Sequence, residues 1–124
     1  IELFKRLDQH LSGIIREKSK RHHHILTKMM YMIEIQPTLV KKLKHIFGDK
    51  ANIWNQDFLT DSLKKTDFDC IIGNPPFNCK GMKKVPTNKA SSKRQDGKTI
   101  WPDFVKKSIE YVKDSGYLAM ITPS

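Results

Sequence analysis

The run Asn74-Pro75-Pro76-Phe77 combines residue types that could hold a planar molecule bearing an amino group. Asn74 has a side-chain carbonyl, and the carbonyl of Pro75 has no competing N–H beside it, because Pro76 lacks one. Two such acceptors can take both hydrogens of one –NH2 group, while Phe77 offers a flat apolar face to a ring. The same four residues also fit a rigid turn with a core phenylalanine, so the motif alone leaves both interpretations open.

Two acidic residues come at the ends of predicted strands. Glu34 lies near the end of the apolar run Tyr31–Ile35, and Asp57 follows Asn52–Asn55. In parallel sheets, ligands bind at the carboxyl ends of the strands, where an acid can accept hydrogen bonds from both ribose hydroxyls of a nucleoside. A second acid could receive the exocyclic amine of its adenine. Acids at strand ends are more often caps or solvated turns, so neither is specific by itself.

The hydrophobic pattern predicts the elements that position these residues. An amphipathic helix starts at Ile1, and its apolar face runs from Leu3 to Ile14 and Ile15. A polar stretch (16–24) and a short helix or turn (25–30) follow. Strands are predicted at 31–35, 52–55, 68–72 and 117–121, with Cys70 in the core. Helices begin at Pro37 and Trp101 and are ended by Gly48 and Gly116. Alternating strands and helices predict an α/β fold with a parallel sheet and flanking helices.

Composition narrows the class of protein. The 124 residues fit one domain, and the net charge of +10 favours a nucleic-acid partner over a membrane. No apolar run approaches the roughly 20 residues of a membrane span. Two cysteines cannot form a disulfide framework, so we expect a cytoplasmic protein.

Much of the charge is concentrated in residues 78–99, which carry seven Lys and Arg against Asp96 and almost nothing apolar. We expect a long mobile loop there. The run His22-His23-His24 has no Cys or acid at ligand spacing, and it fits a solvated or phosphate-facing patch better than a metal site.

In this order and spacing, the segments resemble the S-adenosylmethionine-dependent amino-methyltransferases, and most of all the restriction-modification DNA adenine-N6 methyltransferases. The run Phe68–Phe77 resembles the family's fourth motif, an apolar strand followed by Asn-Pro-Pro-aromatic. Tyr31–Pro37 resembles the second motif and Asn55–Leu59 the third. Trp101–Ser124 resembles the helix and strand that follow.

The resemblance implies a partial Rossmann-like class I methyltransferase sheet with flanking helices and S-adenosylmethionine as cofactor. Glu34 would bind the cofactor ribose and Asp57 its adenine. The cofactor site would also include Ile35, Phe58 and Asn74.

The catalytic loop of such an enzyme would be Asn74, Pro75, Pro76 and Phe77. The resemblance implies that Asn74 and the Pro75 carbonyl hold the N6 amine of an adenine flipped out of duplex DNA, with Phe77 stacked on its ring. No metal is implied, because the sulfonium is already an activated leaving group.

The sequence departs from the family at its start. No two of its six glycines are separated by a single residue, and no strand precedes the first helix, so the family's first strand and glycine-rich turn are missing. We therefore expect residues 1–124 to be part of a larger catalytic domain. In the family that strand lies between those ending at Glu34 and Asn74, so a gap in the sheet is expected there. The isolated chain is expected to bind the cofactor weakly or not at all and to be inactive.

Other functions stay open. RNA base and protein-glutamine methyltransferases share the Asn-Pro-Pro-aromatic form, and a non-catalytic remnant could still bind nucleic acid. In the basic loop, four side chains are candidates to clamp backbone phosphates beside the flipped base, unless the loop is a disordered insertion without a partner: Lys83, Lys84, Lys93 and Arg94.

Overall fold

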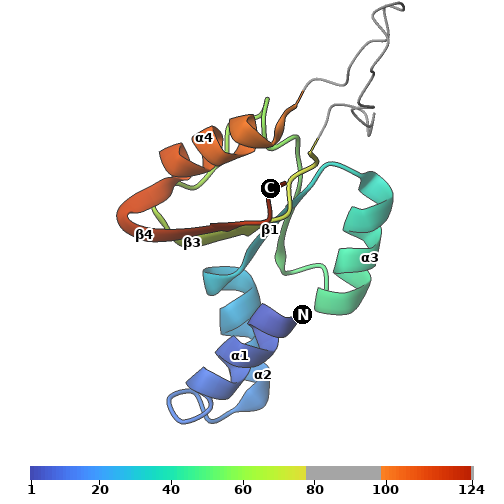
Figure 1. The fold of residues 1–124 in the computed structure, drawn as a ribbon. Coiled ribbons are helices and arrows are strands. Elements are labelled where there is room, and N and C mark those ends of the chain that lie inside the picture. The colour runs from blue at the N-terminus through green and yellow to red at the C-terminus, as the bar shows by residue number, and fades with distance from the viewer. Residues whose placement is uncertain (78–98, 124) are drawn as a thin grey trace, which may run out of the picture. The chain divides into compact units, whose positions relative to one another are not determined.

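The computed structural model describes residues 1–77 and 99–123, which leaves the predicted basic loop outside the described residues. The chain divides into two compact units, Ile1–Asp61 and Ser62–Ser124 (Figure 1). Strands and helices alternate in both units, as the hydrophobic pattern predicts.

The first unit begins with two helices and a π-helical turn. They are α1 (Glu2–Leu11), α2 (Lys18–His24) and η1 (Ile25–Met29). The first helix ends earlier than predicted, because the chain turns at Ser12, whose Oγ donates to the Gln9 carbonyl (2.7 Å). The prediction that Ile14 lies on an apolar helix face is therefore wrong, and its side chain is 76% exposed.

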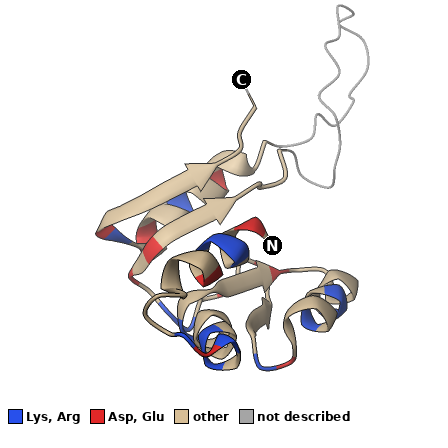
Figure 2. Ribbon diagram, turned by 90° about the horizontal axis from the view of Figure 1, so that it is seen from below, with Lys and Arg blue, Asp and Glu red and all other residues tan. Residues whose placement is uncertain are grey.

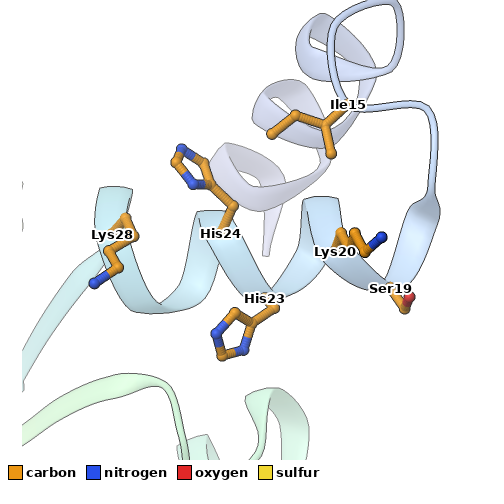
Figure 3. A pocket seen from close by; sticks show the side chains of 6 residues that line it. All are labelled: Ile15, Ser19, Lys20, His23, His24 and Lys28. Carbon is orange, nitrogen blue, oxygen red and sulfur yellow. The ribbon is translucent and has the colours of Figure 1, made fainter.

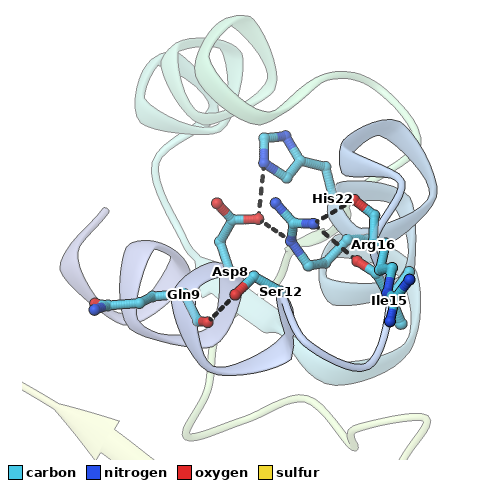
Figure 4. A network of polar contacts seen from close by, with 7 residues as sticks. Asp8, Gln9, Ser12, Ile15, Arg16 and His22 are labelled. Atoms are coloured by element: carbon cyan, nitrogen blue, oxygen red, sulfur yellow. Dashed lines mark hydrogen bonds and ion pairs between the residues drawn. The ribbon is translucent and has the colours of Figure 1, made fainter.

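The predicted polar stretch contains the helix α2, which is held by a buried charged side chain and not by an apolar face. Arg21 is only 7% exposed. Its Nε donates to Asp8 Oδ1 (2.5 Å), and its Nη1 donates to the carbonyls of Ile15 (2.8 Å) and Arg16 (3.1 Å). His22 Nε2 lies 3.1 Å from the same Asp8 oxygen (Figure 4). This polar network joins α1, the turn after it and α2.

A βαβ segment completes the first unit. It consists of β1 (Tyr31–Glu34), α3 (Pro37–Phe47) and β2 (Asn52–Asn55). The two strands are parallel, from Tyr31 opposite Asn52 to Glu34 opposite Asn55, and α3 packs against both. Apolar side chains buried in this unit are Ile25, Met30, Val40 and Ile53.

Proline and glycine mark the ends of α3 as predicted. Pro37 occupies its first turn, where the missing N–H costs no helical hydrogen bond. Gly48 follows the helix with a φ of +85°, a conformation that glycine adopts without strain. The connection into β2 therefore depends on a glycine at this position.

The second unit contains another parallel βαβ segment. Its elements are β3 (Phe68–Gly73), α4 (Trp101–Tyr111) and β4 (Val112–Met120). The prediction that α4 runs on to Gly116 is wrong, because the backbone is already extended at Val112 (φ −82°, ψ 141°). The last strand consequently begins five residues before the predicted Tyr117.

Gly116 serves a close approach of two backbones rather than a helix end. The register shifts here, since Phe68 pairs with Val112 but Cys70 pairs with Tyr117. A Cβ on Gly116 would lie 2.5 Å from the Val112 side chain and 3.0 Å from the Phe68 carbonyl. The prediction that Cys70 is buried is also wrong, because the alternation along β3 places it on an exposed side of this small sheet.

The four strands form two separate two-stranded sheets, β1–β2 and β3–β4. In the described part of the chain, strands β1, β2 and β3 contain no Lys or Arg, and most of these residues belong to helices (Figure 2). The chain is thus an α/β protein built from two parallel βαβ segments.

Candidate functional site

The carboxyl ends of β1 and β2 are tied together by Asn55. Its Nδ2 donates to the carbonyls of Glu34 (2.9 Å) and Ile35 (3.0 Å). This double contact fixes the backbone where it leaves β1 and enters the turn before α3. Sequence reasoning gave Asn55 no role of its own, because its position opposite Glu34 follows from the register of the two strands.

Glu34 is held in one orientation by the start of α3. Its Oε1 accepts a hydrogen bond from the backbone N–H of Gln36 (2.8 Å), so this oxygen serves the turn. Among the described residues, no hydrogen bond or ion pair reaches its Oε2. Ile35, which follows directly, is 57% exposed. A fixed carboxylate oxygen and an open apolar side chain therefore lie side by side in the chain, a combination that fits a nucleoside.

Asp57 starts a tight turn after β2. Its Oδ1 accepts from the Leu59 N–H (2.8 Å), and its own N–H donates to Asp61 Oδ2 (2.9 Å). Asp57 and Phe58 are both half-buried. One carboxylate oxygen of Asp57 therefore stabilises the turn after its strand, as one oxygen of Glu34 does after β1.

The Asn74–Phe77 loop of the second unit is anchored at both ends by its neighbours. The Ile121 N–H donates to the Gly73 carbonyl (3.0 Å), and the Ile100 N–H donates to the Phe77 carbonyl (3.2 Å). Pro75 is buried between these anchors, Asn74 is exposed, and Phe77 is 41% exposed. The loop therefore exposes the Asn74 amide and part of the Phe77 ring between two backbone hydrogen bonds.

A methionine from β4 lies close to the glycine that precedes this loop. A Cβ on Gly73 would lie 2.6 Å from Met120 Sδ, which is shorter than a normal contact. A larger side chain at this position would require the flexible end of Met120 to move. The anchoring residues Ile100 and Ile121 and this methionine were not among the predicted site residues, since their contacts depend on how β3 and β4 pair.

The predicted site residues fall into the two units as follows. Glu34, Ile35, Asp57 and Phe58 follow β1 and β2 in the first unit. Asn74, Pro75, Pro76 and Phe77 follow β3 in the second. The predicted phosphate clamp, Lys83, Lys84, Lys93 and Arg94, lies outside the described residues.

Neither a metal centre nor a membrane helix is found within residues 1–77 and 99–123. These residues contain no group of three His, Cys, Asp or Glu side chains that could hold a metal ion. Nor does any helix in those ranges have the length and apolar character of a membrane span.

The chain is an α/β protein with two parallel βαβ segments. In each segment, a polar residue lies at the carboxyl end of the first strand. The chain belongs to the Eco57I restriction-modification methylase family, whose family model matches residues 5–124. The resemblance to restriction-modification methyltransferases is therefore confirmed.

Two proteins illustrate the range of similar sequences. A putative type II restriction enzyme and methyltransferase from Methanocaldococcus jannaschii is 41% identical over 64 residues, 50% of this chain and 5% of that protein. A release factor glutamine methyltransferase from Clostridium botulinum is 30% identical over 86 residues, 62% of this chain and 30% of that protein. The chain thus spans less than a third of either relative.

Proposed function

We propose that the protein takes part in methyl transfer from S-adenosylmethionine to the N6 amine of an adenine flipped out of duplex DNA. The observation that carries this proposal is the anchored Asn74–Phe77 loop in a chain of the restriction-modification methylase family. The cofactor, when bound, supplies a methyl group on a positively charged sulfur, and the chain's own residues have to position the amine that receives it.

Asn74 Oδ1 and the Pro75 carbonyl would accept hydrogen bonds from the two N6 hydrogens. Accepting both bonds directs the nitrogen lone pair away from the ring and toward the methyl carbon. The bound cofactor would supply the methyl group to this nitrogen, and the amine would give up one proton to solvent. Phe77 would stack on the extruded base. A loop fixed at both ends favours this role, because positioning two bound reactants lowers a barrier only when neither can move away.

Glu34, Ile35, Asp57 and Phe58 would bind the cofactor. The Glu34 oxygen that is not used by Gln36 can accept from ribose hydroxyls, and the exposed Ile35 can pack on the adenine of the cofactor. Asp57 would receive the exocyclic amine of that adenine, with Phe58 beside it. The four basic residues of the loop, Lys83, Lys84, Lys93 and Arg94, would contact DNA phosphates near the flipped base.

A second candidate function is methylation of a glutamine side-chain amide in a protein. It is favoured by the identity to the release factor glutamine methyltransferase over 62% of this chain. A glutamine amide also offers a planar –NH2 group to the same two acceptors. An RNA base is the third substrate that would fit this arrangement.

Methyl-transfer assays on the full-length protein separate these substrates. With labelled cofactor, we expect incorporation into adenine of duplex DNA, and not into a Gly-Gly-Gln peptide or ribosomal RNA. Asn74→Ala should lower the rate by at least about 100-fold, the usual cost of losing one such polar contact to the reacting group. Its affinity for the cofactor, measured by calorimetry, should fall much less than the rate, because Glu34, Ile35, Asp57 and Phe58 would still bind the cofactor.

Asn52→Ala is the matched control for this substitution. It removes an amide of the same type from the amino end of β2, where Asn52 Nδ2 donates to the Met30 carbonyl (3.2 Å). A similar loss of activity in both variants would refute the role of Asn74. Transfer to the peptide alone would replace DNA by protein as the substrate.

A further inference from the structure

An open hollow lies on the first unit, beside the helices that precede β1. It has a volume of about 480 Å³ and is lined by Ile15, Ser19, Lys20, His23, His24 and Lys28 (Figure 3). Lys20, His24 and Lys28 follow one another at intervals of four residues, which brings side chains to one side of a helix. Except for Ile15, every lining residue has a side chain that can donate a hydrogen bond.

The hollow is lined by no carboxylate. Glu17, the residue before α2, contacts two of the lining residues: its Oε2 lies 2.7 Å from Lys20 Nζ and its Oε1 accepts from Ser19 Oγ (2.6 Å). The Lys20 and Glu17 side chains are 75% and 55% exposed, so their ion pair is weak and an arriving anion can replace it. Asp8 is already engaged by Arg21 and His22. The local charge therefore favours an anion.

The position of the hollow separates it from the candidate cofactor site. The elements α2 and η1 lead directly into β1, so the hollow lies on the amino-terminal side of this strand. Glu34 and the other cofactor candidates follow its carboxyl end. Nothing in the proposed methyl transfer uses these basic side chains.

We propose that this hollow, defined by Lys20, His23, His24 and Lys28 with Ser19 and Ile15, binds phosphates of a DNA backbone away from the target base. The proposal rests on DNA being the substrate. Lys and His side chains and a serine hydroxyl are groups that contact phosphate without reading sequence. Lys20 belongs to α2 and Lys28 to η1, and they lie at opposite ends of the lining (Figure 3). Two separated cationic side chains can contact different phosphates of one strand, since phosphates repeat about every 3.4 Å along the duplex.

The test compares two double variants of the full-length protein that lose the same charge. One is Lys20→Gln with Lys28→Gln in the hollow; the control is Lys41→Gln with Lys42→Gln on the exposed side of α3. Binding of a fluorescent duplex is measured by anisotropy over a series of salt concentrations. Losing two phosphate contacts should reduce the slope of log affinity against log salt by about 1.8, because each contact contributes about 0.9. The control should change the slope much less.

Equal changes in the two double variants, or no change in either, would overturn the proposal. Loss of binding to polyglutamate without loss of binding to DNA would also overturn it and point to an acidic protein.

Methyl transfer at saturating DNA concentration is measured in the same proteins. If the hollow variant weakens duplex binding but the wild type methylates only the peptide, the hollow is supported and the proposed function fails. If DNA is methylated and the slopes are equal, the hollow alone fails.

Discussion

Arg21 is a buried cation whose partners come from two helices and the turn between them. Its guanidinium reaches Asp8 and the carbonyls of Ile15 and Arg16, so one side chain closes the α1–α2 corner. A buried charge is costly unless each of its donors finds a partner. The network supplies partners for Nε and Nη1 from one carboxylate and two carbonyls, and His22 also approaches that carboxylate. The fold of this corner therefore depends on polar contacts more than on apolar packing.

Replacement of Arg21 should show that dependence. Arg21→Met keeps the apolar stem but leaves Asp8 and two carbonyls without their donors, and we expect a loss of about 2–4 kcal/mol in the free energy of unfolding. Arg16→Met, on an exposed side chain whose carbonyl remains in place, is the control. Urea unfolding measures both variants. Equal stabilities for the two would contradict a structural role for the network.

At the scale of elements, the hydrophobic pattern predicts the helices and strands that have an apolar side. β1, α3, β2 and β3 lie where the pattern places them, because the apolar runs and the amphipathic spacing that predict them are local features of the sequence. It does not predict α2, which buries an arginine, nor the start of β4 at Val112. Both depend on partners distant in sequence. Asp8 pairs with Arg21 of α2, and the backbone of Phe68 lies close to Gly116 in β4.

The end of α3 permits a direct test of a glycine conformation. Gly48 has a φ of +85°, and a Cβ added there would meet no atom within 4 Å, so Gly48→Ala introduces backbone strain and no clash. We expect a loss of about 1 kcal/mol in the free energy of unfolding.

Gly13→Ala is the matched control, because Gly13 also has open space around it but no positive φ. This variant should be neutral or slightly more stable, since alanine restricts the unfolded chain. Thermal unfolding of both variants is the measurement. A Gly48→Ala protein as stable as the Gly13→Ala protein would contradict the strain argument.

At the scale of the whole molecule, sequence reasoning places the candidate residues at the ends of the correct strands but not their supporting contacts. The motif at Asn74 and the acids at Glu34 and Asp57 are visible in the sequence because their types and spacing are specific together. The anchoring of the loop by Ile100 and Ile121, and of Glu34 by Gln36 and Asn55, follows from strand pairing and local turns. The residue types at these positions do not indicate such contacts in the sequence.

Acid should destabilise the molecule through its paired carboxylates. The hydrogen bond from Arg21 holds the pKa of Asp8 below its ordinary value of 3.8. At pH values near and below 3.8, the folded state therefore binds fewer protons at Asp8 than the unfolded chain does. The stability that Asp8 contributes is fully present above 3.8 and is lost as the pH falls through the lower folded-state pKa.

Urea unfolding at neutral pH and at several values below 3.8 tests this dependence. A Trp101→Phe background leaves Trp54 in β2 as the fluorescent reporter of the first unit. We expect the wild-type protein to lose stability in acid, and Asp8→Asn to have a lower stability at neutral pH but a flatter acid profile. Parallel profiles for the two proteins would contradict the assignment.

The division into two-stranded sheets has a consequence for how the chain behaves in concentrated solution. Within the described residues, each strand is hydrogen-bonded to one neighbour, so every strand is an edge strand. Open edges are templates for strands of other molecules, and an apolar edge invites aggregation. On β3, Ile72 is 62% exposed and no Lys interrupts the strand. Colloidal stability therefore depends on mutual repulsion between molecules, which the net charge of +10 supplies and added salt screens.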